Sequence, residues 1–138
     1  MAAINTSVGS SLLKFTFSDA DGEVVASFRM NPADIKLAHR CQEVLAYFEN
    51  LHNNTPESAT LEDAAKLNDE MEEKICYLLG YDAKQSLFGL ISATSIMGDG
   101  NLFAVTVMDK IVENVGPEIQ RRKQSMAAAV AKHTAKYT

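Results

Sequence analysis

Hydrophobic and polar residues alternate in two short runs near the start of the sequence. Three apolar side chains alternate with polar ones in residues 13–18, and residues 24–29 repeat the pattern after the turn-forming sequence at 19–22. A period of two is typical of strands with one buried face, and an Asp-Gly turn between two such runs predicts a β-hairpin. An isolated hairpin is marginally stable in water. We therefore expect Phe15, Phe17 and Phe28 to pack on the helices that follow.

The sequence after the hairpin has the spacing of an amphipathic helix from about residue 32 to residue 51. Asn31 is suited to cap this helix, Pro32 fits its first position, and Asp34 favours its positive end. Apolar residues recur at steps of three and four and predict one buried stripe. The stripe consists of Leu37, Cys41, Val44, Phe48 and Leu51, widened by Ile35, Ala38 and Leu45.

A second long helix is predicted from residue 61 to residue 79, after the polar, proline-containing segment 53–58. Thr60 and Asp63 have the spacing of a helix cap with an acidic third position, and Gly80 is a natural helix stop. Its predicted apolar face is formed by Leu61, Ala64, Leu67, Met71, Ile75, Leu78 and Leu79. Asp82 is suited to cap a short helix at 83–88, which Gly89 ends. Residues 90–97 are apolar and rich in Ser and Thr, and their pattern leaves helix and extended structure both open.

A third long helix is predicted to start with Asn101 as its cap and to end at Val115. Val105, Met108, Ile111, Val112 and Val115 form its apolar stripe. Gly116-Pro117 is expected to interrupt it, and the sequence then becomes basic. Residues 119–138 carry five cations and no acidic residue, with few large apolar side chains, which favours an exposed helix or a tail.

These elements predict an α+β fold that is mostly α. An N-terminal β-hairpin packs on a bundle of three main helices plus a short helix. We expect a flexible arm at residues 1–10, a single domain at 11–116, and a basic exposed helix or tail at 117–138. The length of 138 residues fits one domain with a sizeable core.

Composition and charge exclude several classes of protein. Apolar residues make up 46% and charged residues 22%, which is ordinary for a globular protein, and no apolar run approaches the length of a membrane span. The first residues lack the features of a secretory signal. A net charge of −5 is opposite in sign to a nucleic-acid footprint over the whole domain. We expect no membrane or nucleic-acid partner.

Metal and catalytic motifs are not found. Cys41 and Cys76 are 35 residues apart, without further ligands at metal-binding spacing, and both fall in apolar contexts that predict burial. The sequence that begins at Asp19 starts like a calcium loop, but Val24 and Met30 stand where Gly and Glu are required. His39, His52 and His133 are expected to lie on the surface.

The acidic run at 69–73 is dense enough to suggest an acid–base pair. We interpret Asp69, Glu70, Glu72 and Glu73 as a solvated helix face, with Met71 and Ile75 on the buried side. The sequence thus predicts a protein that is not an enzyme, with no catalytic residue, no metal and no cofactor.

The basic tail is the candidate binding site. It carries Arg121, Arg122, Lys123, Lys132 and Lys136. Residues 57–82 hold eight acidic residues and two lysines, a net charge of −6. The tail is therefore expected to contact an acidic protein partner, or the acidic helix of another copy of the chain in a homo-oligomer.

Several motifs occur in an order that resembles one family. The opening Leu13-Lys-Phe15-Thr-Phe17-Ser-Asp19-Ala-Asp21 precedes a long helix, and the next helix ends with Leu78-Leu79-Gly80-Tyr81. After these come Ser86-Leu87-Phe88-Gly89, a helix that starts at Asn101, and a basic tail that ends with Lys136-Tyr137. In this order the chain resembles the tail assembly chaperones of Gram-positive bacteriophages and prophages.

The resemblance implies a non-enzymatic role in tail morphogenesis. Such chaperones coat the long helical tape measure protein until tail tube subunits replace them, and they act in the cytoplasm of the bacterial host. The apolar stripe that a tape measure helix exposes needs reversible shielding. The amphipathic helices and six methionines of this chain suit such contacts. Two alternatives are a virion structural component, such as a head–tail completion or small tail protein, and a phage effector that binds a host protein.

Overall fold

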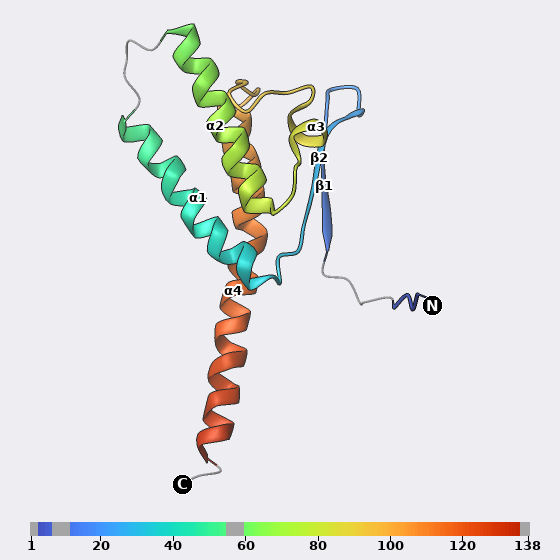
Figure 1. Cartoon of the computed structure of the whole chain (residues 1–138), viewed down its shortest axis with the longest axis vertical. Coiled ribbons are helices and arrows are strands. Elements are labelled where there is room, and N and C mark those ends of the chain that lie inside the picture. The colour runs from blue at the N-terminus through green and yellow to red at the C-terminus, as the bar shows by residue number, and fades with distance from the viewer. Residues whose placement is uncertain (1–2, 7–11, 55–59, 136–138) are drawn as a thin grey trace.

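The computed structural model of the chain describes residues 3–6, 12–54 and 60–135, and the side chains of most of them. Two strands, β1 (Leu13–Ser18) and β2 (Val24–Met30), precede the helices α1 (Ile35–Asn54), α2 (Leu61–Leu79), α3 (Lys84–Phe88) and α4 (Phe103–Ala135). In Figure 1 the hairpin stands beside α3 and the three long helices cross one another, with the second half of α4 extending away from the rest. The predicted α+β architecture is confirmed.

The hairpin forms as its alternation predicts. β1 and β2 pair antiparallel, with Lys14 opposite Arg29 and Phe15 opposite Phe28. The turn is held by the Asp19 carboxylate, which accepts hydrogen bonds from the N–H groups of Asp21 and Glu23 at 2.9 and 3.0 Å. Gly22 has a φ of +83°, which L side chains rarely adopt and which explains the glycine. A bulge follows, because Val25 has no opposite residue on β1.

One face of the hairpin joins the helical core. Phe28 is only 1% exposed and stacks on Phe15, with ring centres 4.8 Å apart. Phe17 meets Phe103 of α4 edge to face at 5.2 Å. Phe15 and Phe17 are half-buried, since they lie on the outer strand. The expectation that the three phenylalanines pack on the helices is confirmed, with Phe28 the most deeply buried.

Helix α1 begins three residues later than predicted. The Asn31 carboxamide accepts a hydrogen bond from the Ala33 N–H, which closes a turn before the helix. Asp34 then caps α1, its carboxylate accepting from the Lys36 N–H at 3.0 Å. The prediction of an Asn31 cap and Pro32 as first helical residue was therefore wrong. Ile35, expected at the edge of the buried stripe, lies in the first turn of α1 and is 59% exposed.

Helix α2 has the predicted ends. Thr60 Oγ1 accepts from the Asp63 N–H and the Asp63 carboxylate accepts from the Thr60 N–H, both at 3.2 Å, which completes a capping box. Gly80 ends the helix with a φ of +83°. Leu61 was placed on the apolar face, but it is 88% exposed because the first turns of α2 extend past their neighbours.

The segment between α3 and α4 is irregular. Residues 90–97, for which the sequence left helix and extended structure open, therefore form neither a helix nor a regular strand. The only regular feature of the segment among the described residues is an isolated bridge between Ile96 and Leu102. The prediction that Asn101 caps the helix that follows was wrong, since α4 begins at Phe103. The first turn of α4 is held instead by backbone carbonyls, Ser95 accepting from the Phe103 N–H and Ala93 from the Ala104 N–H.

Helix α4 continues through Gly116 and Pro117 to Ala135. The predicted end at Val115 was wrong. Pro117 lacks the N–H that would bond to the Glu113 carbonyl, and its ring crowds that carbonyl, at a typical cost of about 3 kcal/mol. The helix is nevertheless continuous through this position. The first half of α4 fills the core. Its buried side chains are Phe103, Ala104, Val107, Met108, Ile111 and Val115, whereas Val112 of the predicted stripe faces outward.

Candidate protein-interaction site

The basic residues predicted to bind a partner lie on the second half of α4 or beyond it. Arg121 is exposed, and its guanidinium pairs with the Glu118 carboxylate at 2.8 Å. Arg122, Lys123 and Lys132 belong to the helix, but their side chains lie outside the described residues, as does all of Lys136. The structure therefore places four of the five basic residues on the second half of α4, namely Arg121, Arg122, Lys123 and Lys132.

The second half of α4 extends from the body of the molecule (Figure 1). Among the described side chains of the helix, Val115 is the last that is fully buried, and those from Gln120 onward are exposed. Residues 116–135 span about 30 Å at the rise of an α-helix. Because most of a helix's stability in a protein comes from packing of one face, the stability of this half depends on continuity with the buried half or on a partner.

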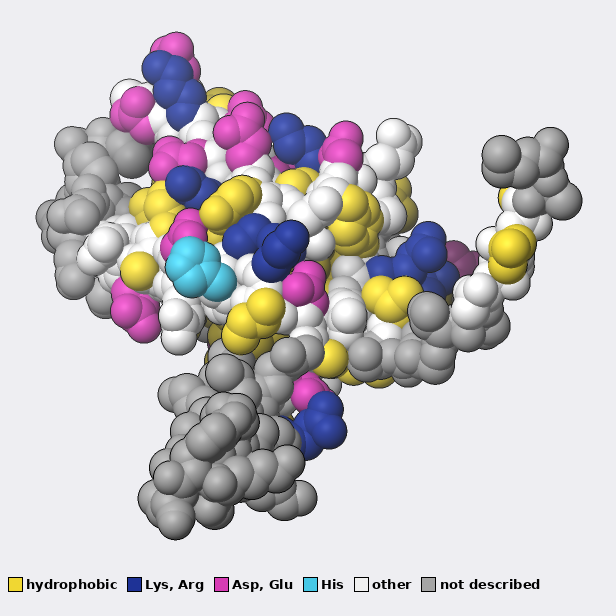
Figure 2. Space-filling model, turned by 60° about the horizontal axis from the view of Figure 1, so that its bottom comes forward, with side chains coloured by type: hydrophobic (Ala, Val, Ile, Leu, Met, Phe, Trp, Pro, Cys, Tyr) yellow, Lys and Arg dark blue, Asp and Glu magenta, His cyan; other side chains and the backbone are white. Residues whose placement is uncertain are grey.

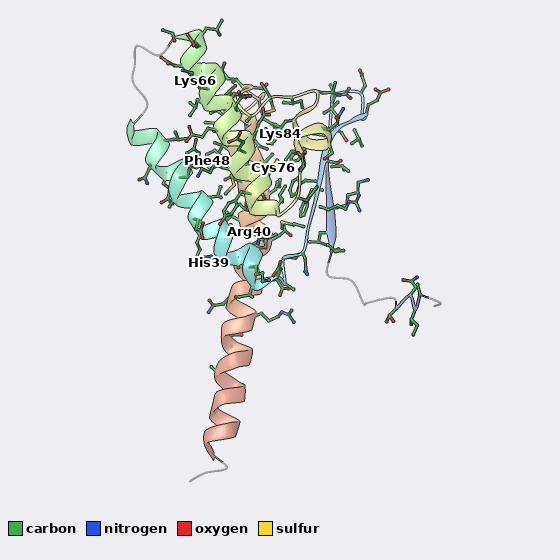
Figure 3. All side chains as sticks on the ribbon, in the orientation of Figure 1. His39, Arg40, Phe48, Lys66, Cys76 and Lys84 are labelled. Carbon is green, nitrogen blue, oxygen red and sulfur yellow. The ribbon has the colours of Figure 1, made fainter. Side chains whose placement is uncertain are left out.

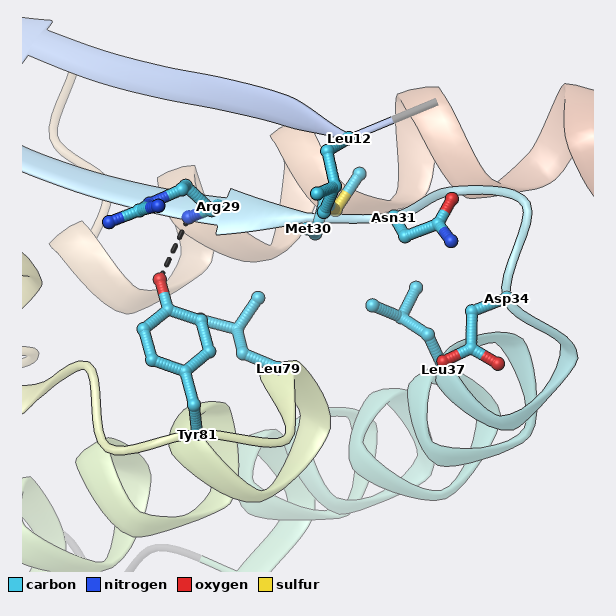
Figure 4. A pocket seen from close by; sticks show the side chains of 8 residues that line it. All are labelled: Leu12, Arg29, Met30, Asn31, Asp34, Leu37, Leu79 and Tyr81. Atoms are coloured by element: carbon cyan, nitrogen blue, oxygen red, sulfur yellow. Dashed lines mark hydrogen bonds between the residues drawn. The ribbon is translucent and has the colours of Figure 1, made fainter. Parts of the chain in front are cut away.

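A groove of about 380 Å³ lies between the end of β2, the start of α1 and the end of α2 (Figure 4). We call it the hairpin groove. It is lined by Leu12, Arg29, Met30, Asn31, Asp34, Leu37, Leu79 and Tyr81. Met30, Leu37 and Leu79 are buried apolar side chains at its base, whereas Arg29 and Asp34 bring charge to its edge.

Two long-range contacts hold the hairpin groove. The Tyr81 hydroxyl accepts a hydrogen bond from the Arg29 N–H at 2.8 Å, which joins β2 to the residue after the α2 stop (Figure 4). Arg40 Nε donates to the Leu78 carbonyl at 3.0 Å and ties α1 to the last turn of α2. This arrangement can accept an apolar side chain of a partner with a polar group beside it. The sequence did not predict the groove because its walls come from three distant segments.

A second surface lies on α1 and α2. His39 Nδ1 is 3.0 Å from Glu43 Oε1, and the Tyr77 hydroxyl donates to Glu43 Oε2 at 2.9 Å. The hydrogen bond to Glu43 raises the pKa of Tyr77. His39 and Arg40 lie on the first turns of α1 (Figure 3), and His39 is exposed as predicted. Figure 2 shows basic, acidic and hydrophobic side chains intermixed on this side of the molecule, without one large patch of either charge.

The acidic run of α2 has one member with an internal role. Asp69, Glu70 and Glu73 are exposed as predicted, but Glu72 is half-buried. Its carboxylate accepts from Asn68 Nδ2 at 2.7 Å and from the Ala93 N–H at 3.3 Å. Asn68 Oδ1 in turn accepts from both the N–H and the hydroxyl of Thr94. We call these contacts the Asn68 clasp, because they hold the irregular segment before α4.

The cysteines lie where their apolar contexts predict. Cys41 is buried between the helices and Cys76 is half-buried, and neither forms a disulfide. Burial raises the pKa of both thiols. Both thiols are therefore weakly nucleophilic at neutral pH.

Within the part of the chain that the structure describes, no group of three or more His, Cys, Asp or Glu side chains is placed to hold a metal ion. None of the described helices is long and apolar enough to cross a membrane. Comparison with known proteins finds no matching family model, no matching curated protein and no matching solved structure.

Proposed function

We propose that this chain is a non-enzymatic, protein-binding protein, and that its role is that of a bacteriophage tail assembly chaperone. In this role it shields the tape measure protein in the cytoplasm of the bacterial host during tail morphogenesis. The order of sequence motifs from Leu13 to Tyr137 supports the choice of family. The observation that carries the binding role is the second half of α4, a basic helix that continues about 30 Å past Val115, the last of its described side chains that is buried.

The physical reason is that such a helix has little to stabilise it within its own chain. Its described side chains after Val115 are mostly exposed, and its composition combines alanine with five cations in residues 119–138. Helices with these properties gain stability when a partner covers one face. Opposite charge on that partner speeds encounter and fixes its orientation.

The test is binding of the tape measure protein encoded beside this chain. We would co-express the two proteins and compare the wild-type chain with a triple variant, Arg121→Glu, Arg122→Glu and Lys123→Glu. Lys110→Glu is the matched control, because Lys110 is an exposed cation on the buried half of the same helix, paired with Glu113. The triple variant should lose tape measure protein in pull-down at low salt, whereas the control should retain it.

Purified virions separate the chaperone role from the structural alternative. A chaperone is absent from mature particles, so detection of the chain there at stoichiometric amounts contradicts the proposal. Equal binding of the tape measure protein by the wild type and the triple variant contradicts the assignment of binding to α4. A gene that lies away from the tail-tube and tape-measure genes favours the effector alternative.

A further inference from the structure

The outer edge of β1 presents backbone groups to the outside of the molecule. The Arg29 N–H bonds to the Tyr81 hydroxyl, so the backbone of Arg29 faces away from β1. Lys14 lies opposite Arg29 and Thr16 lies opposite Ser27. Because opposite residues alternate between bonded and non-bonded pairs, Lys14 and Thr16 direct their N–H and C=O groups away from β2.

The two edges of the hairpin differ in what covers them. β2 packs against α3, and Tyr81 satisfies one of its outward N–H groups. In the described part of the chain the sheet has only these two strands, so no strand pairs with the outer edge of β1. Figure 1 shows the hairpin on the side of the molecule away from α1.

The apolar side chains of β1 are also only partly covered by the described residues. Leu13, Phe15 and Phe17 share the inward face of the strand, yet Leu13 is 39% exposed and both phenylalanines are only half-buried. Phe28, one strand further in, is almost fully buried. A third strand beside β1 would complete the cover of this apolar row.

The charges of the hairpin indicate what that third strand is. Lys14 and Arg29 lie side by side at the open end, where like charges repel. Asp19, Asp21 and Glu23 gather at the turn. The hairpin is thus positive at one end and negative at the other. An antiparallel copy places each positive end beside a negative turn, whereas a parallel copy places Lys14 beside Lys14.

We propose that two copies of the chain associate through their β1 edges and form one four-stranded antiparallel sheet. The symmetry axis passes at Thr16, which pairs with Thr16 of the partner subunit, and Lys14 pairs with the partner's Ser18 next to the acidic turn. A symmetry axis at Lys14 would instead place the two Lys14 side chains next to each other. An axis at Phe15 would move Lys14 away from the acidic turn of the partner subunit. This self-association does not depend on the proposed function.

The association is expected to be weak, because a single pair of short strands buries less than about 1,200 Å². Sedimentation of the full chain between about 10 μM and about 1 mM should show a concentration-dependent dimer. Thr16→Pro removes an outward N–H without removing a bond between β1 and β2, and should abolish the dimer, whereas Thr16→Val should keep it. A wild-type monomer at all concentrations, or a dimer unaffected by Thr16→Pro, overturns the proposal.

Charge reversal tests the orientation. Lys14→Glu places an acid opposite Arg29 within the hairpin, so the fold should remain stable. In the dimer the new glutamate would lie beside the acidic turn of the partner subunit and be repelled by it. Dimerisation should weaken about tenfold or more. Adding Asp21→Lys to the same chain should restore it. Failure of the double variant to recover, with both variants folded, contradicts the antiparallel arrangement.

Disulfide trapping tests the register. In a bonded antiparallel pair the Cα atoms are about 5.5 Å apart, within the range that a disulfide spans. Thr16→Cys should therefore cross-link the dimer under mild oxidation. Lys14→Cys is the matched control, because its two copies would be about 13 Å apart along the strands. The parent chain controls for Cys41 and Cys76. Equal cross-linking of both variants, or none by Thr16→Cys, overturns the register.

Discussion

Phe28 is the most deeply buried side chain that the hairpin contributes to the core. It is 1% exposed and touches Phe15 on the neighbouring strand. Phe28→Ala should lower the free energy of unfolding by about 3–5 kcal/mol, because it removes a large buried ring and leaves a cavity. Urea denaturation measures this loss. Val24→Ala on the same strand is the control, since Val24 is 58% exposed and should cost under about 1 kcal/mol. Equal midpoints for Phe28→Ala and the wild type would contradict the packing described for the hairpin.

Tyr47 is a half-buried residue whose enclosed hydroxyl is unsatisfied. Its hydroxyl is enclosed and makes no hydrogen bond of normal geometry with any described residue. Lys74 Nζ lies 5.3 Å from the centre of its ring. Burial raises the pKa of Tyr47, and the neighbouring Glu70 carboxylate raises it further. The phenol therefore keeps its proton in the folded chain at pH values where the unfolded chain loses it.

This shift predicts a loss of stability in alkali. The unfolded tyrosine titrates near its ordinary pKa of 10.0, and the folded one titrates higher. Stability from the neutral phenol is complete below pH 10 and declines as the pH rises from there toward the folded pKa. Tyr47→Phe should show a shallower alkaline decline in the free energy of unfolding, and no loss at pH 7. Parallel curves for the two proteins between pH 8 and pH 11 would refute this.

The burial of single residues could be predicted on the strands and less well on the first turns of the helices. The alternation of Phe15, Phe17 and Phe28 was sufficient, because a strand has only two faces. Ile35 and Leu61 continue the periodicity of their helices, but each lies in a first turn and is exposed. Periodicity gives the face of a helix and not the point at which its neighbour ends.

The ends of elements were predictable where side chains decide them. Thr60, Asp63 and Gly80 bound α2 through their own chemistry. At α1, Asn31 and Asp34 both favour a cap, and the turn closed by Asn31 moves the start to the second of them. Pro117 does not end α4, although proline usually kinks or breaks a helix, so a composition signal alone misplaced this end.

The Asn68 clasp is an element-scale contact that makes its own prediction. Asn68→Ala removes the acceptor for the N–H and hydroxyl of Thr94 and should cost about 1–3 kcal/mol. Hydrogen exchange at the Thr94 amide should accelerate. Asp69→Ala, an exposed acidic neighbour on the same helix, should change neither quantity. An unchanged exchange rate at Thr94 in Asn68→Ala would show that the clasp does not hold the segment.

The second half of α4 should contribute little to global stability. Removal of residues 123–138 leaves every described core residue in place, so the thermal midpoint should fall by less than about 2 °C. A chain that ends at residue 114 is the control, because it also loses the buried Val115 and should unfold at a clearly lower temperature. If the 122-residue chain does not fold, the extension belongs to the core.

At the scale of the whole molecule, the architecture could be predicted and the hairpin groove could not. The order of one hairpin and three long helices follows from local periodicity. The hairpin groove depends on how Arg29, Leu37 and Tyr81 come together, which is set by helix crossing and by one hydrogen bond across 52 residues of sequence. The only local signal was the Gly80 stop, which fixes the position of Tyr81.

The fold should not depend on a metal or on reduction. Among the described residues no cluster of ligands is present, and both cysteines are free. EDTA and dithiothreitol should each shift the thermal midpoint by less than about 2 °C, because neither removes a stabilising bond. Differential scanning calorimetry in each additive measures the effect. A larger decrease in EDTA alone would reveal a structural metal.

The extended half of α4 also governs how the molecule moves through water. A rod about 30 Å long attached to a rounded body increases frictional drag and makes rotational diffusion anisotropic. The 15.1 kDa monomer should therefore elute early from a gel-filtration column, at the position of a larger sphere. Amide relaxation should distinguish N–H vectors parallel to the rod from those across it. Shortening the helix should remove both effects. Light scattering or sedimentation equilibrium measures the true mass, which the elution volume overstates.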